Sequence, residues 1–419
     1  MHARGARTTV SWEDRLDGWV DEGLTRAATF GDLVRALPGV TPDEALRSLA
    51  RLRDDRADAL AADARVDRAP RLIDQCGALP LPHPLDSEFR FDVPTARRLA
   101  DVLLEVTAPG DEILLVGTPT VAIEFARMRA DRLVRFLGPR DGVTAAVAAA
   151  FGGKGLALGG GAGGTAAAAL VDPPWYARPF GDMLSACSRG CRAGAPAWVV
   201  LPPLGARPGA AEDRAAFVAM ARRAGLAGTG GSELVWYRTP LFELAAMELQ
   251  GLGRLADWRR GDLMSFVVER PQEPSSPVHL PTVCELTLRG VRLRIVGNGS
   301  SAAPGPALLT AVGRAEVFSS VSSRAPGRER ANLWTTGNRA FHVDAAAARA
   351  AMAAIAREET KVLHSGIAAR QSDIPLDSGI APPNRLIHQL LELIGRELDD
   401  ARRLVGDGAW LDTGTEWTC

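Results

Sequence analysis

The residues of this 419-residue chain best suited to chemistry follow a short apolar run and read Asp172-Pro173-Pro174-Trp175-Tyr176. The apolar run indicates a buried parallel strand, and the two prolines end it because they lack backbone N–H groups and fix φ. Asp172 is therefore expected at the carboxyl end of a central strand, where open α/β sheets bind their ligands. There the Asp172 side chain and the Pro173 carbonyl could accept hydrogen bonds from an amine, with Trp175 or Tyr176 stacked on its flat group.

Alternating strands and helices surround this motif. Besides the strand that ends at Asp172, apolar strands are predicted at residues 112–117, 133–137, 197–201, 234–237 and 262–268, and helices at 96–105, 118–129, 180–193 and 211–224. This alternation predicts an α/β fold with a Rossmann-like doubly wound sheet over residues 96–270. Gly117, at the end of the first strand, would let the backbone approach a cofactor closely, beside free N–H groups at the start of the next helix.

The Asp172-Pro173-Pro174-Trp175 tetrapeptide resembles that of class I S-adenosylmethionine-dependent amino-methyltransferases of the Asp/Asn-Pro-Pro-aromatic type. The strand-glycine unit at 112–117 precedes it, which is the order of the unpermuted members, and the resemblance covers about 175 residues. It implies that Asp172 and the Pro173 carbonyl bind the target amine and that Trp175 or Tyr176 stacks on the acceptor. S-adenosylmethionine would supply the methyl group, with catalysis arising mainly from alignment of the reacting atoms.

The same resemblance implies a cofactor site formed by Gly117, Thr118, Pro119, Gly138 and Asp141. The chain departs from the family pattern at both strand ends of this site. The first loop has one glycine where the family commonly has Gly-x-Gly. At the end of the second strand Gly138 replaces the acidic residue that holds the ribose hydroxyls, and Asp141 is the substitute.

A weaker resemblance connects the chain to the branched-chain polyamine synthases, which have a winged-helix-like N-terminal region, a Rossmann domain and an Asp-Pro-Pro-aromatic motif. It implies aminopropyl transfer to an amine. The acidic run of that family is replaced here by Thr118-Pro119-Thr120, which counts against this activity. A third alternative is a non-catalytic binding or assembly protein on a decayed methyltransferase fold. The acceptor stays open between a small molecule and a nucleic acid, whose base would have to be flipped out of a duplex.

Three further segments have two readings each. The first contains His83, Asp86 and Arg90, which either contact substrate from a loop folded over the site or form ion pairs in an ordinary linker. Residues 238–243 and 258–261 either reach the same ligand face or serve as loop and cap residues.

Three regions lie outside the predicted Rossmann-like domain, and one glycine-rich stretch lies within it. Residues 11–66 are predicted to be helical and winged-helix-like, either docking nucleic acid or, as their acidic residues favour, serving in packing or dimerisation. Residues 67–95 are expected to form an irregular linker because prolines interrupt them. After a proline- and serine-rich break, residues 282–419 are expected to form an α+β domain of unknown role. Residues 152–164 are nearly all glycine and alanine and are expected to be a flexible connection.

The amino-acid composition counts against some classes of function. The chain balances 49 basic against 50 acidic residues, which counts against a basic nucleic-acid surface. The near absence of lysine and the abundant arginine and alanine are typical of a GC-rich bacterial genome. Without a long apolar run or a secretory signal, a cytoplasmic protein with no membrane span is expected, alone or as a homodimer or with a protein partner. The five cysteines lack zinc or disulfide spacing and are expected to be core residues, with no metal site.

Overall fold

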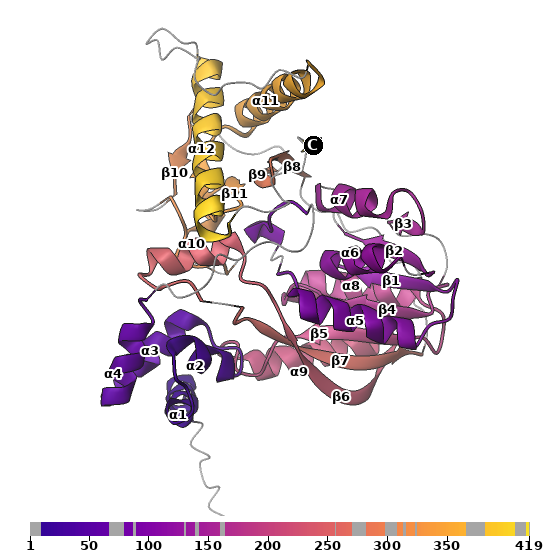
Figure 1. Ribbon diagram of the computed structural model, residues 1–419, viewed down its shortest axis with the longest axis vertical. Coiled ribbons are helices and arrows are strands. Elements are labelled where there is room, and N and C mark those ends of the chain that lie inside the picture. Colours follow the sequence, from indigo (N-terminus) through magenta and orange to yellow (C-terminus); the bar gives the residue numbers. More distant parts are fainter. Residues whose placement is uncertain are drawn as a thin grey trace, which may run out of the picture.

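The structure is a computed structural model that describes residues 10–66, 79–86, 89–129, 131–138, 142–159, 164–255, 257–269, 282–297, 308–312, 316–322, 325–365, 382–406 and 416–418. The N-terminal helices lie beside one end of a central sheet. A smaller C-terminal sheet and its two long helices form a separate part of the molecule, at the top of Figure 1.

The N-terminal domain is helical. It contains α1 (Trp12–Leu24), α2 (Phe30–Ala36), α3 (Pro42–Leu52) and α4 (Asp55–Asp63). Ser11 and Thr29 cap the first two helices by accepting hydrogen bonds from backbone N–H groups of the first turn, which satisfies donors that the helix itself cannot pair. Residues 10–66, all of which the structure describes, contain no strand. The predicted winged-helix character is therefore not confirmed, since the wing is a strand pair.

Within the described residues, seven strands form the central sheet in the order β3-β2-β1-β4-β5-β7-β6. These are β1 (Glu112–Val116), β2 (Leu133–Leu137), β3 (Leu156–Leu158), β4 (Ala168–Val171), β5 (Pro196–Leu201), β6 (Leu226–Trp236) and β7 (Arg260–Val268). Strands β1 to β5 run parallel, and β7 runs antiparallel to both β5 and β6. The predicted mixed α/β fold with a mainly parallel sheet is thus confirmed.

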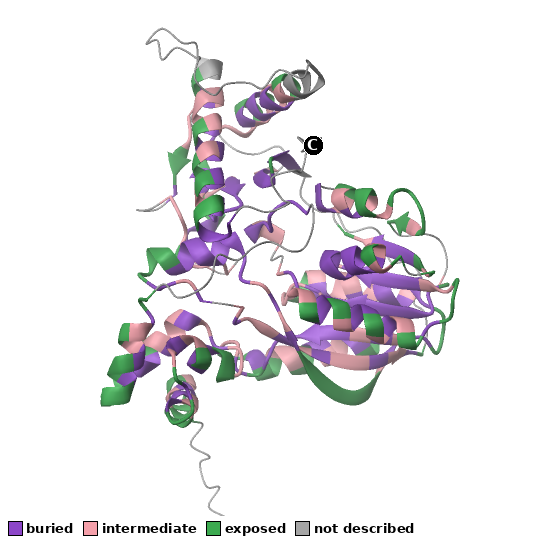
Figure 2. Ribbon diagram, in the orientation of Figure 1, coloured by how far each residue is buried: buried purple, intermediate pink, exposed green. Residues whose placement is uncertain are grey.

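Helices cover both faces of this sheet. They are α5 (Val93–Glu105), α6 (Pro119–Met128), α7 (Gly142–Phe151), α8 (Ala177–Gly190) and α9 (Ala210–Arg223). In β1, Ile113 and Leu115 pack with α5 to α7, whereas Leu114 and Val116 pack with α8 and α9. Because successive strand residues point to opposite faces, an unbroken apolar strand serves both cores. Figure 2 shows the resulting buried interior and the exposed stretch of the edge strand β6.

Two strand segments in glycine-rich stretches were not predicted from the sequence. The stretch 152–164, expected to be a flexible connection, contains β3, which pairs with β2. Strand β6 starts at Leu226, well before the predicted 234, and changes register between Gly228 and Ser232. Glycine is unfavourable in strands, so the strand signal fails where glycine serves an edge or an irregular pairing.

The C-terminal region is built on an antiparallel sheet. Its strands, in the order β10-β12-β11-β9-β8-β13, are β8 (Thr282–Leu288), β9 (Val291–Gly297), β10 (Thr310–Ala311), β11 (Leu333–Thr335), β12 (Ala340–His342) and β13 (Glu416–Thr418). It also contains α11 (Ala345–Ser365), α12 (Pro382–Leu404) and the 3-10 turn η2 (Arg328–Arg330), and the 3-10 turn η1 (Pro84–Asp86), from much earlier in the chain, contacts β11. Helix α10 (Leu241–Leu249), between β6 and β7 in the chain, packs into this core, which ties the C-terminal region to the Rossmann-like domain.

Membrane-spanning helices, metal-binding clusters and the cysteines were each the subject of a prediction from the sequence. Among the described residues, no helix is both long and apolar enough to cross a membrane, and no cluster of three or more His, Cys, Asp or Glu could hold a metal ion. Cys187 and Cys191 are free and buried. Cys284 is disulfide-bonded, contrary to the expectation that the cysteines are simple core residues. Cys76 and Cys419 lie outside the described residues.

Candidate active site

Asp172 follows β4 directly, at the carboxyl edge of the central sheet. Its backbone N–H donates to the Val116 carbonyl of β1 at 3.0 Å, which extends the parallel pairing by one residue. Pro173 and Pro174 then end the strand, and the Tyr176 N–H donates to the Pro174 carbonyl at 2.7 Å to start α8. Within the described part of the chain, no group donates to the Pro173 carbonyl. The motif therefore offers one free backbone acceptor beside a carboxyl group.

The Asp172 side chain has an uncharged hydrogen-bond partner. The Tyr237 hydroxyl at the end of β6 donates to Asp172 Oδ1 at 2.7 Å. Tyr237 is itself fixed by stacking on Phe91, with ring centroids 5.0 Å apart. Burial raises the pKa of Asp172 to about 8, and the Tyr237 hydrogen bond acts in the opposite direction without cancelling it. Asp172 can thus gain or lose a proton near neutral pH, as general bases require.

A cavity of about 380 Å³ opens at Asp172. The motif contributes Asp172, Pro173, Pro174, Trp175 and Tyr176; the rest of the lining is Thr41, Asp43, Glu44, Arg47, Phe89, Ala206, Arg207, Tyr237, Arg259, Ser320, Val321 and Ser322. These residues come from the N-terminal domain, the Rossmann-like domain and the C-terminal region. The cavity is large enough for a small-molecule acceptor, and its wall depends on all three parts of the chain.

The arginines of the cavity wall are paired with carboxylates. Arg47 contacts Asp43 at 2.8 Å, and Arg207 contacts Asp213 at 2.6 Å. Arg259 pairs with Glu243, and its guanidinium lies 4.1 Å from the centroid of the Phe89 ring. Asp172, with a tyrosine as its partner, has no such counter-charge among the residues that the structure describes.

The predicted catalytic residues Asp172, Pro173, Trp175 and Tyr176 lie together on this cavity. The predicted substrate-binding residues His83, Asp86 and Arg90 are not among its lining residues; from their segment only Phe89 is.

His83 and Asp86 face the C-terminal region. His83 is buried, with Nε2 3.3 Å from the Trp334 carbonyl oxygen, and burial together with nearby arginines lowers its pKa well below the usual range. Asp86 pairs with Arg292 at 3.2 Å and also with Arg294. Of the two readings of this segment, the contacts favour ion pairing.

Arg90 is also buried, and its guanidinium donates to the Pro80 carbonyl at 2.5 Å. This contact lies within the same segment of the chain. The rings on either side of Arg90, Phe89 and Phe91, both pack against Tyr237.

The predicted cofactor residues lie at the carboxyl ends of β1 and β2. Gly117 has a φ of +70°, and a Cβ there would come within 2.9 Å of the Asp172 carbonyl oxygen, so only glycine fits. Pro119 is the first residue of α6, and the hydroxyls of Thr118 and Thr120 are buried without a hydrogen-bond partner among the described residues. These unpaired groups at a helix start fit a polar ligand beside Asp172.

The end of β2 fits the predicted S-adenosylmethionine site less well than the end of β1 does. A Cβ at Gly138 would meet the Phe136 ring at 2.6 Å, so a carboxylate cannot replace this glycine without repacking. Asp141, the predicted substitute for the ribose-binding acid, lies outside the described residues. The described residues therefore fit the part of S-adenosylmethionine that would lie at the α6 start, but supply no ribose acid.

Sequence analysis missed several residues of the cavity. Tyr237 gave no functional signal, because its link to Asp172 spans 65 residues of sequence. Thr41, Asp43 and Glu44 belong to the capped start of α3, where the Thr41 hydroxyl donates to the Glu44 carboxylate at 2.8 Å. Arg259 belonged to a loop for which a ligand-facing role was left open, and it lines the cavity.

Comparisons with known proteins give only distant matches. No protein-family model matches the chain, and no curated protein matches it. Among solved structures, the branched-chain polyamine synthase of Thermus thermophilus with N4-aminopropylspermidine and 5'-methylthioadenosine is 14% identical, covering 62% of this chain and 89% of that chain with a TM-score of 0.45. A variant of the 16S rRNA (adenine(1408)-N(1))-methyltransferase of Catenulisporales acidiphilia with S-adenosylmethionine is 19% identical, covering 42% and 94% with a TM-score of 0.28. A TehB-like S-adenosylmethionine-dependent methyltransferase of Corynebacterium glutamicum is 12% identical, covering 42% and 89% with a TM-score of 0.29. At these values the likenesses assign neither a family nor an activity.

Proposed function

We propose that the protein is an S-adenosylmethionine-dependent methyltransferase that acts on a primary or exocyclic amine. The observation that supports this most is Asp172. It is a carboxyl group at the carboxyl end of a central strand, on a cavity, with a pKa of about 8 and with no counter-charge in the described part of the chain. A group that is costly to bury and is nevertheless kept on a cavity is a candidate for chemistry.

The acceptor amine binds at the Asp172-Pro173 corner. One N–H donates to the Asp172 carboxylate and another to the Pro173 carbonyl, which has no donor among the described residues. Two fixed acceptors orient the remaining lone pair, and such alignment of reacting atoms is a large part of catalysis in group transfer. Trp175, Tyr176 and Phe89 offer ring faces to a flat acceptor.

Asp172 also receives the proton. S-adenosylmethionine supplies an electrophilic methyl group on a sulfonium. As the N–CH₃ bond forms and the S–CH₃ bond breaks, the nitrogen loses a proton to the Asp172 carboxylate, which releases it to solvent. A pKa of about 8 suits this role, because the base must be ionised before transfer and basic enough to accept a proton afterwards. Gly117, Thr118 and Pro119 would hold the cofactor at the start of α6.

Aminopropyl transfer to a polyamine is the weaker alternative. A polyamine is a multiple cation, and the described cavity wall offers no excess of acids: Asp43, Glu44 and Asp172 are matched in number by Arg47, Arg207 and Arg259. Thr118-Pro119-Thr120 also provides no carboxylate at the end of β1. Neither feature favours a polycationic acceptor.

Calorimetry tests the donor first. S-adenosylmethionine, its decarboxylated form and S-adenosylhomocysteine are titrated separately into the protein. We expect the first and third to bind; preference for the decarboxylated form would favour aminopropyl transfer, and no binding of any of them would favour an assembly protein.

Transfer is then measured with a methyl-labelled donor over a set of amines. Asp172→Asn should keep donor binding while transfer falls by roughly 10²–10⁴-fold, the usual contribution of a general base. Asp101→Asn, on the exposed face of α5, is the matched control and should transfer at the unaltered rate. Full activity of Asp172→Asn would contradict the proposal.

A further inference from the structure

A smaller cavity of about 100 Å³ adjoins the cavity at Asp172. Both are lined by Thr41, Asp43, Arg259, Ser320 and Val321. We call the smaller one the side cavity. Because the same residues line both, the side cavity is an extension of the space in which the acceptor amine is proposed to bind.

Two buried polar atoms belong to residues of the side cavity. Glu243 of α10 is 4% exposed and Trp258, just before β7, is 3% exposed. Glu243 Oε2 and Trp258 Nε1 have no hydrogen-bond partner among the described residues. A buried polar atom without a partner costs about 1–3 kcal/mol, so two such atoms around one cavity indicate that something else binds there.

Charge limits what that occupant can be. The other oxygen of Glu243, Oε1, accepts a hydrogen bond from Arg259 Nε at 3.1 Å. The Arg259 guanidinium also lies 4.7 Å from the centroid of the Trp258 ring. Among the described residues, the wall thus contains two carboxylates and one guanidinium, and each carboxylate is already paired: Glu243 with Arg259, and Asp43 with Arg47. Neither a cation nor an anion would find an uncompensated charge in the side cavity.

Hydrogen bonding limits it further. The carboxylate oxygen of Glu243 needs a donor, whereas the indole N–H of Trp258 needs an acceptor. A carboxamide supplies both through its NH₂ and C=O groups, and an alcohol supplies both through one oxygen. A cavity of about 100 Å³ has room for a group of only a few heavy atoms.

We propose that the side cavity binds an uncharged carboxamide or alcohol group at the far end of the acceptor whose amine lies at Asp172. The identity of this occupant as part of the acceptor rests on the proposed function. Binding of the isolated group does not, since it requires neither donor nor transfer.

Indole NMR tests this directly. The full-length protein is labelled with ¹⁵N in its tryptophan side chains, and the Trp258 Nε1–H signal is assigned by its loss in Trp258→Phe. Propionamide, 1-propanol, propylammonium and propionate are titrated in turn over millimolar concentrations. We expect saturable shifts of the Trp258 signal with propionamide or 1-propanol and none with the two ions. The signal of Trp334, which is buried in the C-terminal sheet outside both cavities, is the internal control.

A matched pair of variants locates the binding. Ala246 lines the side cavity and Ala206 the larger one. Ala246→Val should abolish the propionamide shift, whereas Ala206→Val should leave it. No shift with any probe, or equal shifts with the ions, would overturn the proposal. So would a propionamide shift that survives Ala246→Val in a folded protein.

The acceptor screen separates this proposal from the proposed function. Amines with a terminal carboxamide or hydroxyl should exceed their methyl-terminated analogues in kcat/KM by roughly 10-fold or more, and Ala246→Val should remove the difference. Propionamide binding without binding of S-adenosylmethionine would reject the methyltransferase and keep the side cavity as a binding site. Transfer that shows no preference among these amines would reject the assignment of the occupant to the acceptor.

Discussion

Asp172 at the cavity and Glu285 in the C-terminal sheet are both carboxyl groups withdrawn from water, yet their pKa values move in opposite directions. Burial raises the pKa of Asp172 to about 8, because its main partner is the neutral Tyr237 hydroxyl. Burial also pushes the pKa of Glu285 upward, but the charges and hydrogen bonds of Arg292 and Arg294 outweigh it and hold the pKa at about 2. The difference lies in the partner charges.

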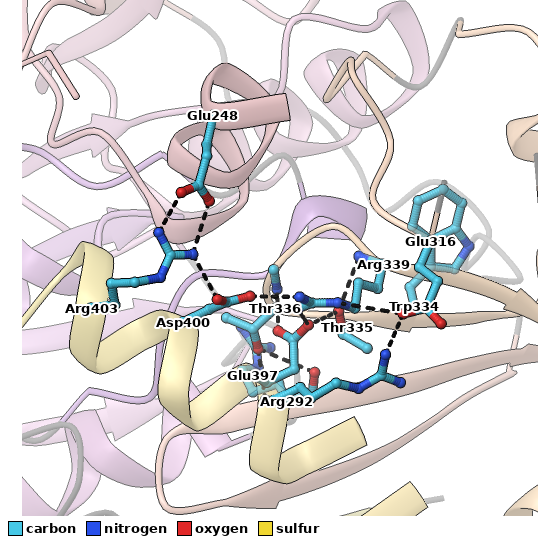
Figure 3. Close-up of polar contacts among 12 residues, drawn as sticks. Glu248, Arg292, Glu316, Trp334, Thr335, Thr336, Arg339, Glu397, Asp400 and Arg403 are labelled. Carbon is cyan, nitrogen blue, oxygen red and sulfur yellow. Dashed lines mark hydrogen bonds and ion pairs between the residues drawn. The ribbon is translucent and has the colours of Figure 1, made fainter. Parts of the chain in front are cut away.

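A second paired cluster lies on α12 (Figure 3). Arg339 pairs with Glu397 and Asp400, each at 2.5 Å, and Asp400 also contacts Arg403 at 2.7 Å. Arg403 reaches Glu248 on α10 at 2.8 Å, which connects the C-terminal helix to the Rossmann-like domain. Both Glu397 oxygens have donors, one of them the Gly337 N–H.

This contrast suggests how to separate structural from functional acids in this molecule. Buried carboxylates whose oxygens are paired with arginines hold parts of the chain together. Asp172 lacks that compensation and lies on a cavity, as groups that must change protonation do.

The largest difference should appear in stability at neutral pH. Glu285→Gln removes the buried carboxylate that Arg292 and Arg294 share, and we expect the free energy of unfolding to fall by about 3–5 kcal/mol. Asp172→Asn is nearly isosteric and removes a group that resists ionisation, so its stability should be unchanged or higher. Chemical denaturation of both variants measures the two values. Equal losses in the two variants would remove the distinction between the two acids.

The pH dependence of stability should differ in sign. Glu285 has a folded pKa of about 2 against its usual 4.5, so its contribution, about 3 kcal/mol by linkage, is complete above pH 4.5 and is lost as the pH falls through 2. Asp172 has a folded pKa of about 8 against 3.8, so the folded state binds its proton more tightly and stability falls as the pH rises between these values.

Melting curves from pH 2 to 9 check both signs. Because Asp172 lies on a cavity, we expect its contribution to be roughly 1–3 kcal/mol, below the full linkage value. Asp172→Asn should melt at a higher temperature than the unaltered protein at pH 9, and the two should converge near pH 4. A constant difference across this range would mean that Asp172 does not titrate as inferred.

Gly117→Ala should have a smaller but specific effect. The added Cβ would meet the Asp172 carbonyl oxygen at 2.9 Å in a backbone with φ of +70°, so we expect a loss of about 1–3 kcal/mol. Gly110→Ala is the matched control, since Gly110 has φ of +82° but nothing within 4 Å of its Cβ. The excess loss in Gly117→Ala measures the close approach of the two loops. An equal loss in both would mean that only backbone conformation matters.

The sequence predicted the Asp172 corner because its causes are local. An apolar run and two prolines determine where β4 ends, and no distant contact is needed for that conclusion. The same holds for Gly117 and for the start of α6 at Pro119. By contrast, the density of polar groups around His83 and Asp86 was equally consistent with a site and with ion pairing. Their partners lie more than 200 residues away in the chain: Arg292 on β9 is 206 residues from Asp86, and Trp334 on β11 is 251 residues from His83.

The environment of Asp172 could not be predicted for the same reason. Burial raises its pKa, and no ion pair with an arginine of the described residues opposes that effect. Both are properties of the packed molecule. The cavity wall combines Thr41, Phe89, Arg259 and Ser320 from separate segments. Sequence patterns report on neighbours in the chain, whereas this wall exists only after the three regions pack together.

The smallest expected effect concerns the hydrogen bond from the Tyr237 hydroxyl to the Asp172 side chain. The Tyr237 hydroxyl lowers the pKa of Asp172 relative to burial alone, so Tyr237→Phe should raise it above 8. The ring still stacks on Phe91, so the fold should be retained. Tyr176→Phe is the matched control, because the chain has only 2 tyrosines and Tyr176 lines the same cavity.

Carbon-13 NMR of the Asp172 carboxyl group, assigned by its loss in Asp172→Asn, measures these pKa values. The titration of Asp172 should move to higher pH in Tyr237→Phe and stay in place in Tyr176→Phe. If transfer is found, the pH at which its rate is half-maximal should move in the same direction, since the ionised carboxylate is the active form. A downward shift in Tyr237→Phe would mean that the hydroxyl stabilises the protonated acid, and Asp172 would then resemble a hydrogen-bond donor more than a base.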